Sequence, residues 1–178
     1  MPVGPRLHVS AESRDALAVR TVSLPTAGDT HDFGLRLAGV LERGDLVVLT
    51  GPLGAGKTAL VQGIGAGLDV QGRIASPTFV IARIHPPNAP SGPTLVHVDA
   101  YRLGSLDEVD DLDLDVDIAS SVTVVEWGAG MVERLAQSWL EIVLDRAADS
   151  ETRTATLYPH GGDWAARVAR LVDLGAAT

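Results

Sequence analysis

The chain has a single lysine, and that lysine lies in a glycine-rich loop with the spacing of a phosphate-binding site. All other basic residues among the 14 Lys and Arg are arginines, whereas residues 51–58 read Gly-Pro-Leu-Gly-Ala-Gly-Lys-Thr. This is a complete G-x-x-x-x-G-K-[ST] motif, in which main-chain N–H groups surround phosphates and a compact ammonium reaches the β- and γ-phosphates. The motif predicts nucleotide binding by six successive residues: Leu53, Gly54, Ala55, Gly56, Lys57 and Thr58.

A magnesium ion is expected beside this loop, because metal ions bridge the β- and γ-phosphates in phosphoryl transfer. The hydroxyl of Thr58 is one candidate ligand. Two carboxylates are further candidates, since Asp99 and Glu126 each end a run of four mostly apolar residues. Such runs predict strands, whose carboxyl ends form the ligand-binding edge of a parallel sheet. The sequence leaves open which of Asp99 and Glu126 binds the metal directly.

Three other positions have two interpretations each. Thr78, in Ser76-Pro77-Thr78, follows the helix expected after the loop. Its hydroxyl is a candidate sensor of the γ-phosphate, or the three residues form a turn that opens a strand. Trp127 either forms a wall of the site or fills the edge of the core. His97 alternates with two valines, which favours a packed strand residue over a ligand.

Charge limits the direct partners of the chain. The net charge is −9 and the pI about 4.8, so long-range electrostatics repel nucleic acid. Residues 107–117 contain six aspartates and one glutamate but lack the glycine and the final glutamate of a calcium loop. We expect a solvated or partner-facing acidic segment there, and any role in RNA chemistry to run through another protein.

The chain has no cysteine, which excludes disulfides, thiolate zinc sites and a cysteine nucleophile. The first residues contain no apolar stretch long enough for a signal peptide, and no later segment approaches the run of about 20 apolar residues that spans a membrane. We therefore expect a cytoplasmic protein without membrane contact. Residues 1–16 lack periodicity and predict a disordered arm, and residues 17–178 predict one domain.

Apolar patterns predict the elements that position the loop. Strands are expected at residues 17–24, 46–50, 79–84, 95–98, 122–125, 140–144 and 152–157, with a surface loop at 85–93. Helices are expected at 30–43, capped by Asp29 or Thr30 and ended by Gly44, and at 57–68 and 164–174. This order predicts an α/β fold of the P-loop NTPase type. We expect a three-layer sandwich with helices on both faces of a mostly parallel sheet that has antiparallel edge strands.

Four motifs together resemble one family. They are the glycine loop at 51–58, Ser-Pro-Thr-Phe at 76–79, His-Val-Asp-Ala-Tyr-Arg-Leu at 97–103 and Val-Glu-Trp-Gly at 125–128. In this order and spacing, across roughly residues 25–145, they are similar to the bacterial TsaE (YjeE) ATPases. That family supports formation of the threonylcarbamoyl modification of adenosine 37 in tRNA.

The resemblance implies roles for several residues. Residues 53–58 would hold the phosphates of ATP, and Thr58 and Glu126 would hold Mg²⁺. Asp99 would lie by the γ-phosphate as base, water positioner or second-shell metal partner. The implied activity is slow ATP hydrolysis coupled to a complex with the TsaB and TsaD subunits, of which TsaD acts on tRNA. Ala129 departs from the pattern, because many relatives have an acidic residue there.

Other classes of nucleotide-binding protein share the glycine loop. A small-molecule P-loop kinase is an alternative, although most such kinases place the loop nearer the N-terminus. A GTPase with an Asn-Lys-x-Asp element is excluded, because the chain has no second lysine. A nucleotide-gated scaffold that does not hydrolyse ATP would use the same residues. Arg102 is the first candidate for an arginine finger.

Overall fold

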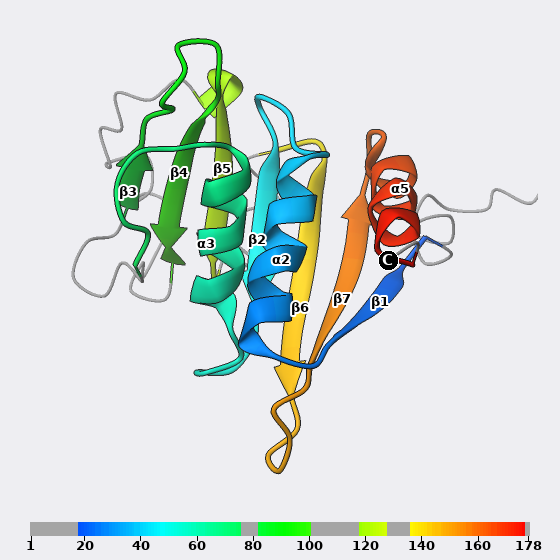
Figure 1. The fold of residues 1–178 in the computed structure, drawn as a ribbon. Helices are drawn as coiled ribbons and strands as arrows, with labels where there is room; N and C mark the ends of the chain where they lie inside the picture. The colour runs from blue at the N-terminus through cyan, green and yellow to red at the C-terminus, as the bar shows by residue number, and fades with distance from the viewer. Residues whose placement is uncertain (1–17, 76–81, 101–117, 128–135, 177–178) are drawn as a thin grey trace, which may run out of the picture.

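The computed structural model describes residues 18–75, 82–100, 118–127 and 136–176. Its strands form one seven-stranded sheet in the order β1-β7-β6-β2-β5-β4-β3 (Figure 1). The strands are β1 (Arg20–Leu24), β2 (Leu46–Thr50), β3 (Ala82–His85), β4 (Thr94–Asp99), β5 (Ser121–Glu126), β6 (Trp139–Arg146) and β7 (Arg153–His160). The helices are α2 (Ala27–Ala38), α3 (Lys57–Gly67) and α5 (Trp164–Ala176), with a short 3₁₀ helix η2 (Ile118–Ser120).

The centre of the sheet is parallel and its edges are antiparallel. Strand β2 pairs in parallel with β5 and β6, and β5 pairs in parallel with β4. Strand β3 is antiparallel to β4, and β7 is antiparallel to both β6 and β1. The predicted α/β class with a mostly parallel centre and antiparallel edges is confirmed.

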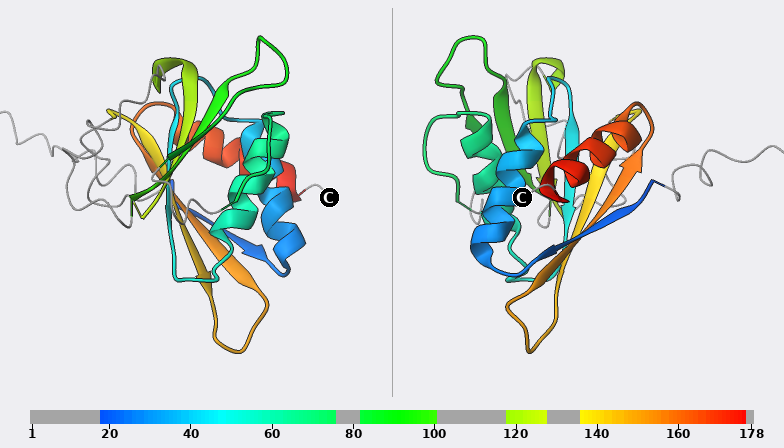
Figure 2. Two further views of the ribbon diagram at one scale, coloured as in Figure 1. Left: turned by 90° about the vertical axis from the view of Figure 1, so that its left-hand side faces the viewer. Right: turned by 45° about the vertical axis from the view of Figure 1, so that its right-hand side comes forward.

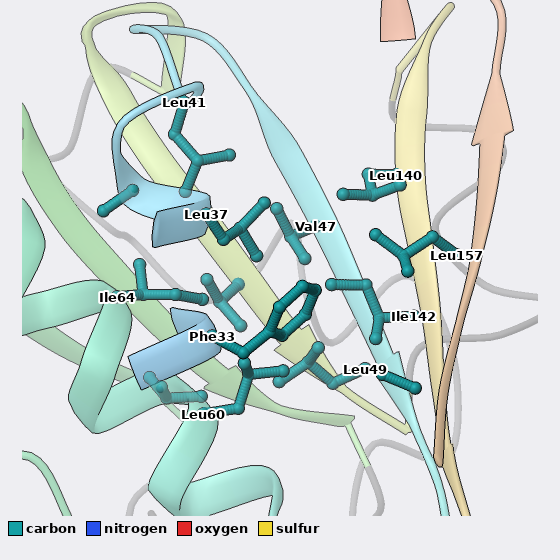
Figure 3. Close-up of a cluster of buried hydrophobic side chains, with 14 of the residues drawn as sticks. Phe33, Leu37, Leu41, Val47, Leu49, Leu60, Ile64, Leu140, Ile142 and Leu157 are labelled. Carbon is teal, nitrogen blue, oxygen red and sulfur yellow. The ribbon is translucent and has the colours of Figure 1, made fainter. Parts of the chain in front are cut away.

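Helices α2, α3 and α5 all lie on one face of the sheet (Figures 1 and 2). They cover a single apolar cluster in which Phe33 and Leu37 of α2 meet Leu60 and Ile64 of α3 above the strands (Figure 3). A second, smaller cluster lies on the opposite face and includes Val48 of β2. The second layer of helices that the sequence predicted is not among the described elements.

Strand β2 explains why the sequence around the glycine loop is so apolar. Val47 and Leu49 belong to the large cluster, whereas Leu46 and Val48 belong to the small one. Because successive side chains of a strand point to opposite faces, a strand in the middle of a covered sheet has apolar residues at every position. The predicted strand at 46–50 is confirmed, and it delivers the chain directly to Gly51.

Helix α2 begins earlier and ends earlier than the sequence predicted. Its N-cap is Thr26, whose hydroxyl accepts a hydrogen bond from the Asp29 N–H at 3.1 Å. The Asp29 carboxylate accepts in turn from the Thr26 N–H at 2.8 Å, which completes a capping box. The predicted caps Asp29 and Thr30 are wrong, because Asp29 occupies the third helical position. The helix ends at Ala38, before Gly39, and Gly44 lies in a later turn with φ of 88°.

The other elements differ from their predictions mainly at their ends. Strand β7 continues through Pro159 to His160, and it can do so because β1 pairs only with residues 153–157, which leaves Pro159 with a neighbour on one side. His85, predicted in a loop, is buried at the end of β3. The segments 1–17 and 79–81 lie outside the described residues. None of the described helices is long and apolar enough to cross a membrane.

Candidate nucleotide and metal site

The glycine loop joins the end of β2 to the start of α3. Gly56 is the N-cap of α3 with φ of 105°, in the left-handed region that favours glycine, and no side chain caps the helix there. The first N–H groups of a helix without a side-chain cap are free to bind an anion, and the helix dipole favours negative charge at this end. The predicted helix over 57–68 is confirmed, with bounds Lys57–Gly67.

Lys57 is buried against its own loop. Its ammonium donates hydrogen bonds to the carbonyl oxygens of Gly51 at 2.8 Å and Pro52 at 3.1 Å. It also lies 4.4 Å from the centre of the Trp127 ring. The pKa of Lys57 is lowered, chiefly because the side chain is buried. The negative charges of Glu126 and Asp99 raise this pKa and so offset part of the effect. The lysine is therefore a cation placed where desolvation opposes its charge and two carboxylates support it.

Glu126 and Asp99 end neighbouring strands at the edge where the loop lies. Parallel pairing of β4 and β5 aligns Asp99 with Glu126, and pairing of β2 with β5 aligns Leu49 with Glu126. Glu126 is 4% exposed, whereas Asp99 is half-buried. The sequence predicted that both carboxylates lie at the carboxyl edge of the sheet, and the structure adds that the two strand ends are adjacent and that β5 lies directly beside the strand that carries the loop.

Trp127 follows Glu126 in a left-handed backbone conformation, with φ of 61°, which is uncommon for a residue other than glycine. Its N–H donates to the carbonyl of Leu49 at 3.0 Å. Its ring lies beside the Lys57 ammonium, and the residue is half-buried. Of the two interpretations, the structure supports a wall of the site, because the indole faces the lysine of the loop.

His97 has a partner that sequence reasoning missed. The sequence correctly predicted a packed strand residue, since His97 is fully buried in β4. However, its Nε2 lies 2.8 Å from Oε1 of Glu126. The signal was present but indirect: His97 and Asp99 are two residues apart, so they share one face of β4, and Asp99 aligns with Glu126.

Arg153 is a second cation beside the loop, and it was also missed. It begins β7 and is 7% exposed, and a Cβ atom added at Gly56 would lie 3.2 Å from its Nε. Its Nη1 donates to the carbonyl of Glu151 at 2.7 Å. The sequence signal was an arginine in phase with Ala155 and Leu157, the buried positions of an alternating strand.

Some predicted site residues lie outside the described residues: Thr78, Arg102, the acidic segment 107–117 and Ala129. Among the described ones, Thr58 is half-buried in the first turn of α3, and Leu53 is 97% exposed at the tip of the loop. The structure therefore brings together Lys57, Asp99 and Glu126, and it presents the loop that carries Leu53 at the surface.

The residues at this edge suit a magnesium ion that is shared with phosphates. In the described part of the chain, no three His, Cys, Asp or Glu side chains gather as a metal site of their own. Magnesium is commonly held by one or two carboxylates together with substrate phosphates and water, rather than by an all-protein cage. The oxygens of Glu126, Asp99 and Thr58 are hard donors of the kind that magnesium prefers.

Sequence comparison connects this site with known proteins. The profile of the family described as "Threonylcarbamoyl adenosine biosynthesis protein TsaE" matches residues 24–155. A tRNA threonylcarbamoyladenosine biosynthesis protein TsaE from Streptomyces coelicolor is 55% identical over 139 residues, which cover 76% of this chain and 93% of that protein. The TsaE of Mycobacterium tuberculosis is 52% identical over 142 residues, covering 76% and 84% of the two chains.

Structural comparison agrees. The crystal structure of YdiB from Bacillus subtilis superposes with a TM-score of 0.69 at 26% identity, covering 88% of this chain and 96% of that one. The matched family region includes β2, the glycine loop, β4 and β5, which together form the site. The predicted family is confirmed: this chain belongs to the TsaE family of tRNA threonylcarbamoyladenosine biosynthesis proteins.

Proposed function

We propose that this protein is a Mg²⁺-dependent ATP-binding protein with slow ATPase activity. It would support threonylcarbamoylation of adenosine 37 in tRNA as an accessory subunit of a TsaB–TsaD complex. The observation that carries the proposal is the meeting of Lys57, in the glycine loop, with the aligned carboxylates Asp99 and Glu126 at one edge of the sheet. A cation for phosphates beside two acids for a metal is the arrangement that phosphoryl transfer requires.

Each of these residues would have its own part. Lys57 would exchange the carbonyl oxygens of Gly51 and Pro52 for phosphate oxygens, and its charge would stabilise negative charge that develops during transfer. Glu126 and Thr58 would hold the metal. When bound, Mg²⁺ supplies neutralisation of charge between the β- and γ-phosphates. Asp99, half-buried at the neighbouring strand end, would orient or deprotonate the attacking water.

Family membership and charge together support the assignment of partners. The relatives are named for a tRNA modification, yet this chain carries a net charge of −9. Like charges repel a polyanion such as tRNA over long range. We therefore assign contact with tRNA to the TsaB–TsaD partners and a nucleotide-dependent supporting role to this chain.

Binding and turnover test the proposal together. ATP affinity would be measured by calorimetry with Mg²⁺, and phosphate release would be measured with and without purified TsaB and TsaD. We expect Lys57→Ala to abolish tight binding and turnover, and partners to accelerate release by the unsubstituted protein. Arg170→Ala, which removes an exposed positive charge from α5, is the matched control and should leave both unchanged.

The possible outcomes separate this function from its alternatives. Tight ATP binding without phosphate release, even with partners, would favour a nucleotide-gated scaffold. Transfer of the γ-phosphate to a small acceptor would favour a kinase. Retention of both binding and release by Lys57→Ala would contradict the assignment of the glycine loop itself.

A further inference from the structure

A buried histidine occupies one oxygen of the carboxylate that we assign to the metal. Nε2 of His97 and Oε1 of Glu126 are 2.8 Å apart, and the two side chains are 0% and 5% exposed. A carboxylate can only accept a hydrogen bond, so Nε2 carries the proton and donates it. Because water cannot compete well at such burial, the bond fixes which oxygen of Glu126 faces the histidine.

The sheet itself enforces this contact. His97 aligns with Val124 and Asp99 aligns with Glu126 in the parallel pair β4–β5. His97 lies two residues before Asp99 and on the same face of β4. Its side chain therefore reaches diagonally across to the carboxylate of Glu126 at the end of β5. Both partners lie on regular strands rather than on a loop, which limits how far either can turn.

The rest of the histidine offers no competing explanation for the contact. Its Nδ1 is buried and has no hydrogen-bond partner among the described residues. The ring is therefore not a link in a longer described network, and its one polar contact there is Glu126. An apolar side chain would fill the space at lower desolvation cost, so the polar choice calls for a role at the carboxylate.

One engaged oxygen leaves the other for a metal. Magnesium keeps near-octahedral geometry with short bonds, whereas calcium takes six to eight oxygens and readily accepts both oxygens of one carboxylate. A glutamate whose Oε1 is held by a histidine presents a single oxygen, which suits magnesium and disfavours calcium. Partners that orient a metal ligand typically alter metal affinity by about 10–100-fold when they are removed.

We propose that His97 is a positioning residue that makes Glu126 a one-oxygen ligand and so selects Mg²⁺ over Ca²⁺ at the nucleotide site. The inference rests on the proposed function, since the metal is the one that accompanies ATP. His97 itself touches neither metal nor nucleotide in this scheme. It acts by restricting the carboxylate.

Substitutions that keep or remove the donor test this role. His97→Gln can place an amide N–H near the position of Nε2, whereas the side chain of His97→Asn is polar but too short, and His97→Leu fills the space without a hydrogen-bond donor. The measurement is the affinity for a slowly hydrolysed ATP analogue, by calorimetry, with Mg²⁺ and separately with Ca²⁺. Thermal unfolding without nucleotide reports on folding independently.

We expect His97→Leu and His97→Asn to reduce the Mg²⁺/Ca²⁺ affinity ratio by about tenfold, within the range seen when such partners are removed. His97→Gln should retain most of the ratio. If the leucine variant fails to fold, the comparison of Gln with Asn carries the test, because both are polar and differ in reach.

Two failures can be told apart. A ratio that stays constant in Asn and Leu variants that still bind the analogue would overturn the positioning role alone. Equal loss of the ratio in Gln and Leu variants would overturn it too, because the donor would then not be the cause. If the unsubstituted protein bound no analogue with either cation, the proposed function would fail, and this inference with it.

Discussion

At the scale of single residues, Lys57 occupies a place where burial and charge conflict. Only 7% of the residue is exposed, and burial is the largest influence on its pKa, which lies below the ordinary value of 10.5. The hydrogen bonds to Gly51 and Pro52 and the charges of two carboxylates only partly offset that cost. Such a lysine destabilises the free protein in order to have a cation ready for phosphates.

Lys57→Met should therefore raise the free energy of unfolding at neutral pH. The lowered pKa means that the unfolded chain binds the proton of Lys57 more tightly than the folded chain does. The free energy of unfolding of the unsubstituted protein therefore rises as pH increases from that lowered pKa toward 10.5. Over the same pH range, the difference in stability between it and the methionine variant should become smaller. Chemical denaturation across alkaline pH measures this difference.

The same variant should lose the rise in melting temperature that ATP and Mg²⁺ confer on the unsubstituted protein. Arg170→Met, on the exposed surface of α5, is the control and should change neither quantity. A methionine variant that is clearly less stable than the unsubstituted protein at neutral pH would contradict this account of Lys57.

Glu126→Gln should raise the Mg²⁺ concentration needed for ATP binding by about tenfold or more, because it removes charge from a metal ligand while keeping its shape. The variant should stay folded, since a glutamine carbonyl can still accept from His97. Glu141→Gln, which alters a carboxylate bonded to His160 on the opposite face, is the matched control. An unchanged magnesium titration of Glu126→Gln would exclude this ligand.

At the scale of elements, the helix that follows the loop is fixed by its contact with α2. The two helices approach so closely that glycines stand at the contact: a Cβ at Gly34 would overlap the Leu60 carbonyl, and one at Gly63 would overlap the His31 carbonyl. Close backbone approach of this kind needs residues without side chains. The position of α3, and so of Lys57 at its first turn, depends on these two glycines.

Gly63→Ala should lower the free energy of unfolding by about 1–3 kcal/mol or more, as expected for overpacking of a tight contact. Gly28→Ala is the control, because that glycine is exposed in the first turn of α2 and its added Cβ would meet only ordinary contact at 3.4 Å. For Gly28→Ala we expect the free energy of unfolding to rise by up to about 1 kcal/mol, because alanine has a higher helix propensity than glycine. Urea denaturation measures the free energy of unfolding of both variants. Equal changes in the two variants would contradict the role of the close contact between α2 and α3.

Element prediction succeeded where patterns are local. The strands 46–50, 95–98, 122–125 and 140–144 lie within observed strands, because apolar runs directly reflect burial on a sheet. The start of α2 was misplaced because Thr26, Asp29 and Thr30 are all acceptable caps. Only the reciprocal bonds of the capping box distinguish among them.

At the scale of the whole molecule, the net charge bears on the choice of partner. The net charge is −9, and residues 107–117 contribute most of it, because they contain six aspartates and one glutamate and no basic residue. A charged segment can steer association with a partner of opposite charge, and such steering weakens as salt screens it. This is the segment that we expect the TsaB–TsaD partners to contact.

Reversal of Asp113 and Asp115 to lysine should weaken association with TsaB–TsaD and reduce its salt dependence, while basal phosphate release stays the same. The paired control is reversal of Asp32 and Asp173, two exposed acids on α2 and α5 that change net charge equally. Association is measured by calorimetry or co-purification at several salt concentrations. If the control weakens binding as much, net charge rather than this segment governs the complex.

The sequence by itself determined the glycine loop, its flanking strand and helix, the two carboxylates at strand ends and the family. These are local patterns, because a strand, a turn and a helix each depend on residues close together in the chain. Only the tertiary structure decided that Glu126 bonds His97 and that Arg153 packs against Gly56. Those contacts follow from strand order and register, which are set by the packing of the entire sheet against its helices and which no nearby residues encode.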